Sequence, residues 1–338
     1  MKTLWVEGVD ISHARLVDLT QLADAYPPLD SVLVGDSWAL ARSLPSDYVH
    51  CIVTSPPYFG HREYADDEEL TQFEFGREED PAIYVRKLIA LFEELRRVLR
   101  DTGTLWLNLG DTYRKEQLLG IPWRVALGLQ DTGWILRSEI IWNKPNAMPS
   151  SVKNRPTTAH EHLFLFSKTT DYVYNADAIR EPHVTFSPES KMTGGRGHFG
   201  QRNGTPENGK NKGHANLHTG RWDQAFHPLG RNKRTVWNIA LGKFRDTHFA
   251  VFPEELVRNC LLAGTLEGDV VLDPFMGSGT TACVAKQLSR HFVGLELVPK
   301  YAEMALKRIR QMAVQESFLP LTNSSISSTP IGQNRQIV

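Results

Sequence analysis

The sequence predicts an α/β fold with a mainly parallel, twisted sheet. Short apolar runs that read as strands alternate along the chain with segments whose apolar residues recur at helical spacing. Two of these runs lead directly into glycine- or proline-containing loops rich in polar residues, a place where parallel sheets carry ligand sites. The length of 338 residues and the hydrophobic content of 41% allow one large domain or two.

The first half of the chain contains one well-marked helix among several strands. Asp80 suits the N-cap and Pro81 suits the first turn, so a helix is expected to begin there, and Gly103 is expected to break it. Its apolar residues at helical spacing are Ile83, Leu88, Ile89, Phe92, Leu95 and Leu99. The expected strands are Val32–Val34, which leads to Gly35 and Asp36, then His50–Val53, Thr104–Leu109, Leu136–Trp142 and Leu163–Phe166.

The segment from about residue 180 to 234 differs in composition from the rest. It is polar, contains many glycines, and carries ten Lys or Arg against four acids. It is either a disordered, solvated insertion or a mobile basic arm that contacts a phosphate backbone. The candidate DNA-binding residues are Arg196, Arg202, Lys210, Lys212, Arg221, Arg231, Lys233 and Arg234. Arg196, Arg202, Gln201, Asn203 and Arg221 are also candidate readers of base edges.

The stretch Thr54–Tyr58 closes an apolar run with a rigid corner. Pro56 and Pro57 fix φ and remove two backbone donors, which leaves carbonyl oxygens that can accept hydrogen bonds from an amino group. Tyr58 adds a flat face for stacking. Together they suit the exocyclic amine of a nucleobase, although a strand that simply ends in a Pro-Pro turn is equally compatible with this stretch alone.

A second motif follows more than two hundred residues later. The expected strand Asp269–Leu272 enters a glycine turn and a helix through Leu288, with Gly277, Gly279 and Ala282 at the spacing of a dinucleotide-binding turn. The next strand, His291–Leu295, ends at Glu296, which lies 23 positions beyond Asp273 and suits an adenosine ribose.

The chemistry of the ligand follows from this second motif. A carboxylate at Asp273 repels a pyrophosphate and favours a cation. S-adenosylmethionine carries a sulfonium, an ammonium and a ribose diol, so it is the expected cofactor, with NAD and nucleoside triphosphates as the alternatives.

With both motifs, the chain resembles the bacterial amino-group DNA methyltransferases of the β arrangement, over about residues 31–310 without the basic insert. Thr54–Phe59 resembles the catalytic motif in its serine form, Asp273–Thr281 resembles the cofactor loop, and Phe252-Pro253 resembles the segment over the methionine end of the cofactor. His160–Phe166 also resembles a family segment. The resemblance implies a Rossmann-like S-adenosylmethionine-dependent fold with circularly permuted motif order and a basic target-recognition insertion.

The resemblance also implies roles for individual residues. The catalytic residues would be Ser55, Pro56, Pro57 and Tyr58. The cofactor-binding residues would be Asp36, Phe252, Pro253, Asp273, Pro274, Phe275, Gly277, Ser278, Gly279, Thr280, Thr281 and Glu296. Serine at position 55 is typical of the cytosine-N4 enzymes, whereas the adenine-N6 enzymes usually have Asp or Asn there.

The expected substrate is double-stranded DNA, with a cognate restriction endonuclease as a functional rather than physical partner. The expected parts are an N-terminal segment (1–30), a catalytic half (31–170), a target-recognition region (171–240), a cofactor-binding half (241–316) and a disordered tail (317–338). The alternatives are an adenine-N6 enzyme, an RNA or small-molecule methyltransferase, and a non-catalytic nucleic-acid-binding module.

The cysteines and the length of the apolar stretches indicate where in the cell the protein is expected. Three separated cysteines fit neither a disulfide framework nor zinc spacing, and no apolar stretch is long enough for a membrane span. We therefore expect a protein of the bacterial or archaeal cytoplasm, associated with the nucleoid. His160 and His162 share one face of a strand but lack a clear third ligand, so a structural pair is expected and no metal. Cys51 is expected to be a small core residue.

Overall fold

The computed structural model describes residues 4–6, 16–18, 27–60, 68–182, 227–242 and 253–318. The chain divides into two compact units. The first unit combines Met1–Asn175 with Thr235–Val338, and the second is Ala176–Arg234. Among the described residues, no helix combines the length and the apolar character needed to cross a membrane.

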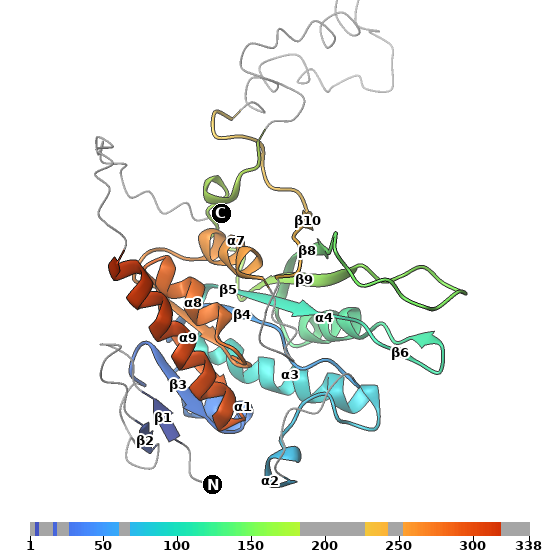
Figure 1. Cartoon of the computed structure of the whole chain (residues 1–338), viewed down its shortest axis with the longest axis horizontal. Helices are drawn as coiled ribbons and strands as arrows, with labels where there is room; N and C mark the ends of the chain where they lie inside the picture. The colour runs from blue at the N-terminus through green and yellow to red at the C-terminus, as the bar shows by residue number, and fades with distance from the viewer. Residues whose placement is uncertain are drawn as a thin grey trace, which may run out of the picture. The chain divides into compact units, whose positions relative to one another are not determined.

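The first unit is built on one large sheet, which lies between two groups of helices (Figure 1). Its ten described strands lie in the order β10-β8-β9-β5-β4-β11-β12-β3-β1-β2. The strands are β1 (Leu4–Val6), β2 (Leu16–Asp18), β3 (Ser31–Val34), β4 (Val49–Thr54), β5 (Leu99–Leu109), β8 (Ile135–Asn143), β9 (His160–Ser167), β10 (Val236–Asn238), β11 (Val270–Asp273) and β12 (His291–Glu296).

Most neighbouring strands in this sheet are parallel. The pairs from β3 through β12, β11 and β4 to β5 are all parallel, whereas β9 is antiparallel to both of its neighbours, β5 and β8. At the opposite side of the sheet, β1 is antiparallel to both β3 and β2. The expected α/β class is confirmed, with antiparallel pairs toward both sides of a parallel centre.

The helices of the first unit are α1 (Ser37–Ser43), α2 (Glu68–Thr71), α3 (Pro81–Val98), α4 (Ile121–Asp131), α7 (Glu254–Gly264), α8 (Thr280–Gln287) and α9 (Pro299–Phe318). A separate two-stranded hairpin consists of β6 (Tyr113–Arg114) and β7 (Gln117–Leu118). Buried residues of α1, α3 and α4 form one core cluster with the strand residues that face them. Helices α7, α8 and α9 pack on one another along the sheet in Figure 1.

Helix α3 begins as the sequence predicts and ends earlier. The Asp80 carboxylate accepts a hydrogen bond from the Ala82 N–H at 2.8 Å, and Pro81 occupies the first turn. The helix ends at Val98, so the prediction that Gly103 ends it was wrong. Gly103 instead lies within β5, where a Cβ atom would stand 2.8 Å from the His50 carbonyl oxygen of β4.

The buried face of α3 also differs slightly from the expected one. Leu88, Phe92 and Leu95 are buried, but Ile83 is 40% exposed. Tyr84 and Leu91 take part in the core instead. The buried face therefore keeps the centre of the apolar pattern and differs from it only at the margins.

The strand order reverses between β4 and β11, and this point positions the site. From β11 the chain continues to β12 on one side, whereas from β4 it continues to β5 on the other. Because both strands are parallel, their carboxyl ends, Thr54 and Asp273, lie at the same edge of the sheet. Ligands of open α/β sheets bind at such a reversal.

Little of the second unit lies within the described residues. It contains the short 3-10 helix η2 (Asp177–Ile179) and an isolated antiparallel bridge between Glu181 and Arg231. Five of the predicted DNA-binding residues, Arg196, Arg202, Lys210, Lys212 and Arg221, lie outside the described residues, as do Gln201 and Asn203.

Candidate active site

The two sequence motifs meet at the reversal of strand order. The Thr54 hydroxyl at the end of β4 donates to the Asp273 carboxylate at the end of β11, at 2.7 Å. The Thr281 hydroxyl in the first turn of α8 donates to the other carboxylate oxygen, also at 2.7 Å. Residues more than two hundred positions apart are thereby held together at one edge of the sheet.

Asp273 performs this joining role from behind the site. Its carboxylate is buried, also accepts the Phe275 N–H, and does not line the cavity beside it. Burial raises its pKa to about 6, although the hydrogen bonds from Thr281, Thr54 and Phe275 favour the charged form. The sequence-based expectation that this carboxylate faces a cationic ligand is therefore corrected, because its oxygens are turned into the protein.

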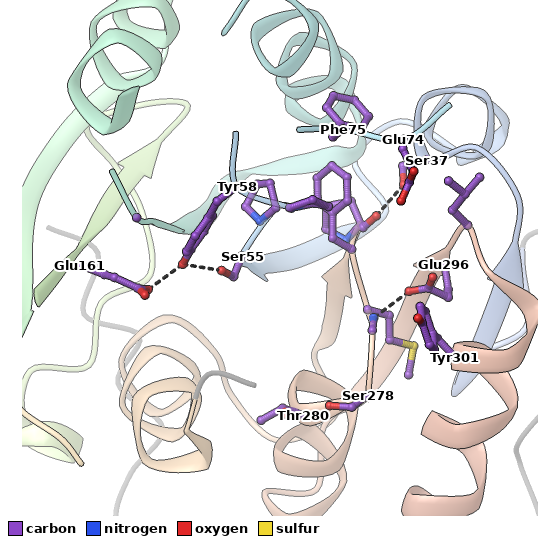
Figure 2. A pocket seen from close by; sticks show the side chains of 18 of the residues that line it. Ser37, Ser55, Tyr58, Glu74, Phe75, Glu161, Ser278, Thr280, Glu296 and Tyr301 are labelled. Atoms are coloured by element: carbon purple, nitrogen blue, oxygen red, sulfur yellow. Dashed lines mark hydrogen bonds between the residues drawn. The ribbon is translucent and has the colours of Figure 1, made fainter. Parts of the chain in front are cut away.

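A cavity of about 460 Å³ extends between the two motifs. Figure 2 shows Ser55, Tyr58 and Glu161 at one end, and Ser278, Thr280, Glu296 and Tyr301 at the other. The predicted residues Ser55, Pro56, Pro57, Tyr58, Pro274, Phe275, Gly277, Ser278, Thr280 and Glu296 all line it. One continuous cavity thus serves both motifs.

Glu296 ends β12 and faces the cavity with a buried carboxylate. One of its oxygens accepts the Gly277 N–H at 2.8 Å and the other accepts the Val298 N–H at 2.9 Å. Burial raises its pKa to about 7 despite these bonds. Each oxygen keeps further lone-pair capacity, so the side chain can accept hydrogen bonds from a diol.

The glycine turn before α8 requires its glycines for two different reasons. Gly277 and Gly279 both adopt positive φ, at 51° and 78°, which side chains disfavour. A Cβ on Gly279 would also stand 2.9 Å from the Cβ of Ala305 in α9. The turn can therefore approach a ligand through its backbone, as the sequence pattern suggests.

At the other end, hydrogen bonds fix the Tyr58 ring. The Tyr58 hydroxyl donates to Glu161 at 2.6 Å and lies 3.0 Å from the Ser55 hydroxyl. The ring lies against the backbone of Gly110, where a Cβ atom would be 2.6 Å from Tyr58 Cε2. Burial, followed by the charge of Glu161, raises the Tyr58 pKa well above its ordinary value, so the hydroxyl keeps its proton.

The two prolines of the corner are not equivalent. The Pro57 carbonyl accepts a hydrogen bond from the Tyr84 hydroxyl at 2.8 Å, a side-chain partner that the sequence does not reveal. Among the described residues, no hydrogen bond reaches the Pro56 carbonyl, and Pro56 lines the cavity. Pro56 therefore supplies an acceptor beside Ser55.

Several predicted cofactor residues do not line the cavity. Asp36 caps α1 by accepting the Ala39 N–H at 3.0 Å, and its neighbour Ser37 lines the cavity in its place. Gly279 shapes the glycine turn with its positive φ, and Thr281 donates a hydrogen bond to Asp273. Pro253 is the N-cap residue of α7, and Phe252 lies outside the described residues.

The three described members of the basic group belong to the second unit. The Nε atoms of Arg231 and Arg234 lie 2.9 and 2.7 Å from the same oxygen of Glu181. The Arg234 side chain remains 67% exposed. Lys233, in the same stretch, is half-buried.

Sequence reasoning missed several residues that line the cavity. They are Ser37, Phe73, Glu74, Phe75, Trp142, Lys144, Thr158, Leu241, Leu297, Val298 and Tyr301. Lys144 forms an ion pair with Glu161, and its ammonium group lies 4.6 Å from the centre of the Trp142 ring. The segment His160–Phe166 did contain a usable signal for Glu161. Glu161 lies between the two histidines on a strand, so its side chain points to the opposite face of the sheet from theirs.

The histidines flanking Glu161 have structural partners. The rings of His160 and His162 are 5.2 Å apart, and His162 Nδ1 lies 2.7 Å from the Glu139 carboxylate. Within the described residues, no group of three or more His, Cys, Asp or Glu side chains is placed to hold a metal ion. Cys51 is fully buried, which confirms its core role, and burial raises its pKa to about 12.

The charge of the cavity limits what it can bind. Glu74, Asp111, Glu161 and Glu296 line it, whereas Lys144 and His160 are its basic lining residues within the described part of the chain. Because Lys144 is paired with Glu161 and Arg77 with Glu74, the acidic lining residues that remain are Asp111 and Glu296. A phosphate-bearing ligand is disfavoured here and a cationic one is favoured.

Comparisons with known proteins agree with this geometry. The family described as DNA methylase matches residues 49–307. The chain belongs to this family. It is 40% identical to the type II methyltransferase M.Cfr9I of Citrobacter freundii, over 82% of this chain and 86% of that protein. It is 37% identical to M.SmaI of Serratia marcescens, over 82% of this chain and 90% of that protein.

Solved structures support the same assignment. The DNA modification methylase TTHA0409 of Thermus thermophilus, complexed with S-adenosylmethionine, aligns with a TM-score of 0.51 at 25% identity, over 82% of this chain and 93% of that one. The PvuII cytosine-N4-specific DNA methyltransferase shares the fold, with a TM-score of 0.59 at 19% identity, over 84% and 92% of the two chains. The chain is thus an amino-group DNA methyltransferase with a Rossmann-like fold.

S-adenosylmethionine is the cofactor of this methyltransferase, and the residues present fit it. The acidic lining suits its sulfonium and ammonium charges, and the Glu296 carboxylate suits its ribose diol. The backbone turn at Gly277 and the side chains of Ser278, Thr280 and Tyr301 complete this half of the cavity.

Proposed function

We propose that this DNA methyltransferase transfers a methyl group to the exocyclic N4 amine of a cytosine that has left the DNA duplex. The observation that carries the proposal is the placement of Ser55 and Tyr58 in the same cavity as Glu296. An amine held at Ser55 therefore lies in the cavity that holds the methyl donor. S-adenosylmethionine supplies the methyl group when it is bound.

The chain's own contribution begins with binding of the amine. The nitrogen is a poor nucleophile because its lone pair is delocalised into the ring. The Ser55 hydroxyl oxygen and the Pro56 carbonyl oxygen accept hydrogen bonds from its two N–H groups. With both protons held, the nitrogen is drawn toward tetrahedral geometry, and its lone pair is directed away from the ring.

The base must leave the helix to reach this cavity. Unpairing and unstacking the base cost on the order of a few kcal/mol. Stacking of the base on Tyr58 offsets about 1–3 kcal/mol of this free energy. The fixed Tyr58 ring favours this role, because its orientation is already set by Gly110 and Glu161 before any base arrives.

Cytosine is favoured over adenine by the residue at position 55. The resemblance to the family associates serine with cytosine N4 and Asp or Asn with adenine N6. A hydroxyl is a weaker acceptor than a carboxylate. The assignment to cytosine follows from this family pattern.

We also propose that the basic stretch between residues 180 and 234 contacts the DNA backbone, and that methylation protects a site cut by a cognate restriction endonuclease. Ten basic residues against four acidic ones support the first part. DNA from cells expressing the protein should resist one endonuclease. Cleavage at unchanged rates by every endonuclease tested against the methylated sites would oppose the second part.

The function is tested by supplying S-adenosylmethionine with a labelled methyl group to the protein together with duplex DNA or RNA. Label should enter duplex DNA, and digestion to nucleosides should locate it on cytosine. Label in RNA alone would contradict the proposed substrate, and label on adenine would contradict the proposed base.

A further inference from the structure

A hydrogen-bond network behind Ser55 contains one residue with no assigned role, Glu161. One of its carboxylate oxygens lies 2.6 Å from the Tyr58 hydroxyl and 2.6 Å from Asn108 Nδ2. Its other oxygen accepts a hydrogen bond from the Lys144 ammonium group. Asn108 Nδ2 also lies 2.8 Å from the Tyr58 oxygen and 3.3 Å from the Ser55 oxygen.

The strand topology brings these residues together. Trp142 in β8 pairs with Glu161 in β9, so Lys144, just beyond β8, lies beside the carboxylate. On the other side, Asn108 in β5 pairs with Leu163 in β9. The inserted antiparallel strand β9 therefore places a charged residue against the catalytic corner.

The direction of each hydrogen bond follows from counting protons. An ionised carboxylate only accepts, so Glu161 must receive the Tyr58 proton. Asn108 Nδ2 carries two protons and faces three oxygens, so it only donates, and one proton is shared between two of the oxygens. The Tyr58 oxygen, its own proton engaged, can then only accept.

Ser55 is left with one consistent orientation. Its hydroxyl lies 3.0 Å from a Tyr58 oxygen that can only accept, so Ser55 donates its proton there. Ser55 lines the cavity, and beyond the lone pair that faces Asn108 it keeps one lone pair for a ligand. With the hydroxyl turned the other way, its proton would meet the N–H groups of the amine and repel them.

We propose that Glu161 is a positioning residue that fixes the polarity of this network and so keeps Ser55 as an acceptor for the amine of the target base. Lys144 holds the carboxylate in place. The inference rests on the proposed function, because it assigns a task to Ser55 that only an amine substrate requires.

The neutral substitution Glu161→Gln tests this polarity with little change in shape. A glutamine amide can donate to Tyr58, and the Tyr58 proton can then point at Ser55, so the acceptor at Ser55 is lost. We expect kcat to fall about a hundredfold, the size typical for loss of one preorganised hydrogen-bonding group. The KM for DNA and the Kd for S-adenosylmethionine should change by less than about threefold, because these ligands gain most of their binding elsewhere.

Glu139→Gln is the matched control. Glu139 lies on the neighbouring strand β8, binds His162 and does not line the cavity, so its substitution should leave kcat unchanged. A folded Glu161→Gln protein with wild-type kcat would overturn the inference. So would an equal loss of kcat in both variants.

A double-mutant cycle separates a positioning role from a general structural one. In a Ser55→Ala protein, Glu161→Gln should have almost no further effect on kcat, because the group that it orients is gone. Multiplicative losses would overturn the inference. If Glu161→Gln fails to fold, Tyr58→Phe removes the same link, and wild-type kcat in folded Tyr58→Phe would overturn it equally.

The product formed by the wild-type enzyme distinguishes failure of the inference about Glu161 from failure of the proposed function. If the wild-type enzyme forms N4-methylcytosine while Glu161→Gln retains full kcat, the polarity inference fails and the proposed function stands. If the wild-type enzyme methylates another group, the proposed function itself fails.

Discussion

Asp273 and Glu296 are carboxylates at the ends of neighbouring strands, and both are buried, but they face in different directions. Asp273 turns into the protein and joins Thr54 to Thr281. Glu296 turns to the cavity and accepts two backbone N–H groups. Burial raises both pKa values, to about 6 and about 7, so at a pH between the ordinary and the raised pKa each folded group binds a proton that it would release on unfolding.

The raised pKa of Glu296 predicts a pH-dependent stability. Its folded pKa of about 7 exceeds the ordinary value of 4.5, so its contribution to stability is full below about pH 4.5 and is lost as the pH rises through 7. Glu296→Gln removes this titration. Between these pH values the free energy of unfolding of the wild type should fall, relative to the variant, by on the order of 3 kcal/mol.

Urea unfolding at several pH values measures this difference. Glu303→Gln on the exposed face of α9 serves as the control and should follow the wild type. A constant difference between wild type and Glu296→Gln across this range would show that Glu296 does not titrate as its burial implies.

Tyr58 provides a second prediction for a single residue. Tyr58→Ala removes the stacking surface and the link between Ser55 and Glu161, but it leaves the glycine turn and Glu296 intact. We expect kcat to fall by about fivefold to 150-fold, the equivalent of about 1–3 kcal/mol of lost stacking. Calorimetric titration should show S-adenosylmethionine bound with nearly unchanged affinity. An equal loss of cofactor affinity would refute the separation of the two ends of the cavity.

At the scale of elements, the parts predicted correctly were those specified by local signals. The Asp80-Pro81 cap, the strand before Thr54 and the strand–turn–helix at Asp273 each follow from residues within a few positions. The role of Gly103 was predicted wrongly because no local signal reveals it. A side chain is excluded there by the His50 carbonyl oxygen of β4, the neighbouring strand.

The missed side chains share a cause. Lys144, Asn108 and Glu161 meet only because β9 inserts antiparallel between β5 and β8, and no local pattern encodes that pairing. From the sequence, His160 and His162 are expected to form a structural pair, and Glu161 between them receives no role. Prediction of the site from sequence was therefore best for its loops and poorest for its hydrogen-bond network.

The loop after β5 gives a prediction at this scale. A Cβ atom on Gly110 would overlap the Tyr58 ring, at 2.6 Å from Cε2. Gly110→Ala should displace the ring, lower kcat at least tenfold and lower the free energy of unfolding by about 1–3 kcal/mol. Gly242→Ala is the control, because a Cβ atom there meets no atom within 4 Å. Steady-state kinetics that remain normal in Gly110→Ala would contradict the fixed position of Tyr58.

At the scale of the whole molecule, the methyl-transfer cavity and the basic stretch belong to different units. The cavity is lined entirely by residues of the first unit. The basic stretch belongs to the second unit. This division predicts that DNA affinity and cofactor affinity can be changed separately.

Neutralising the basic stretch tests that division. Replacement of Arg196, Arg202, Lys210, Lys212 and Arg221 by Gln should weaken DNA binding and flatten its dependence on salt. Each lost phosphate contact lowers the slope of log affinity against log salt by about 0.9. Cofactor affinity should not change. Fluorescence anisotropy with labelled duplex at several salt concentrations measures the slope, and an unchanged slope would exclude these residues from the DNA interface.

The role of Ser55, which we propose presents a cytosine amine to the methyl donor, can be measured on the reaction product. The wild-type protein is incubated with duplex DNA and S-adenosylmethionine that carries a deuterated methyl group, and the nucleosides are then analysed by mass spectrometry. We expect deuterated N4-methylcytosine as the product, and at least a tenfold lower yield from Ser55→Ala at equal cofactor occupancy. N6-methyladenine as the product, or an undiminished yield from Ser55→Ala, would contradict this role.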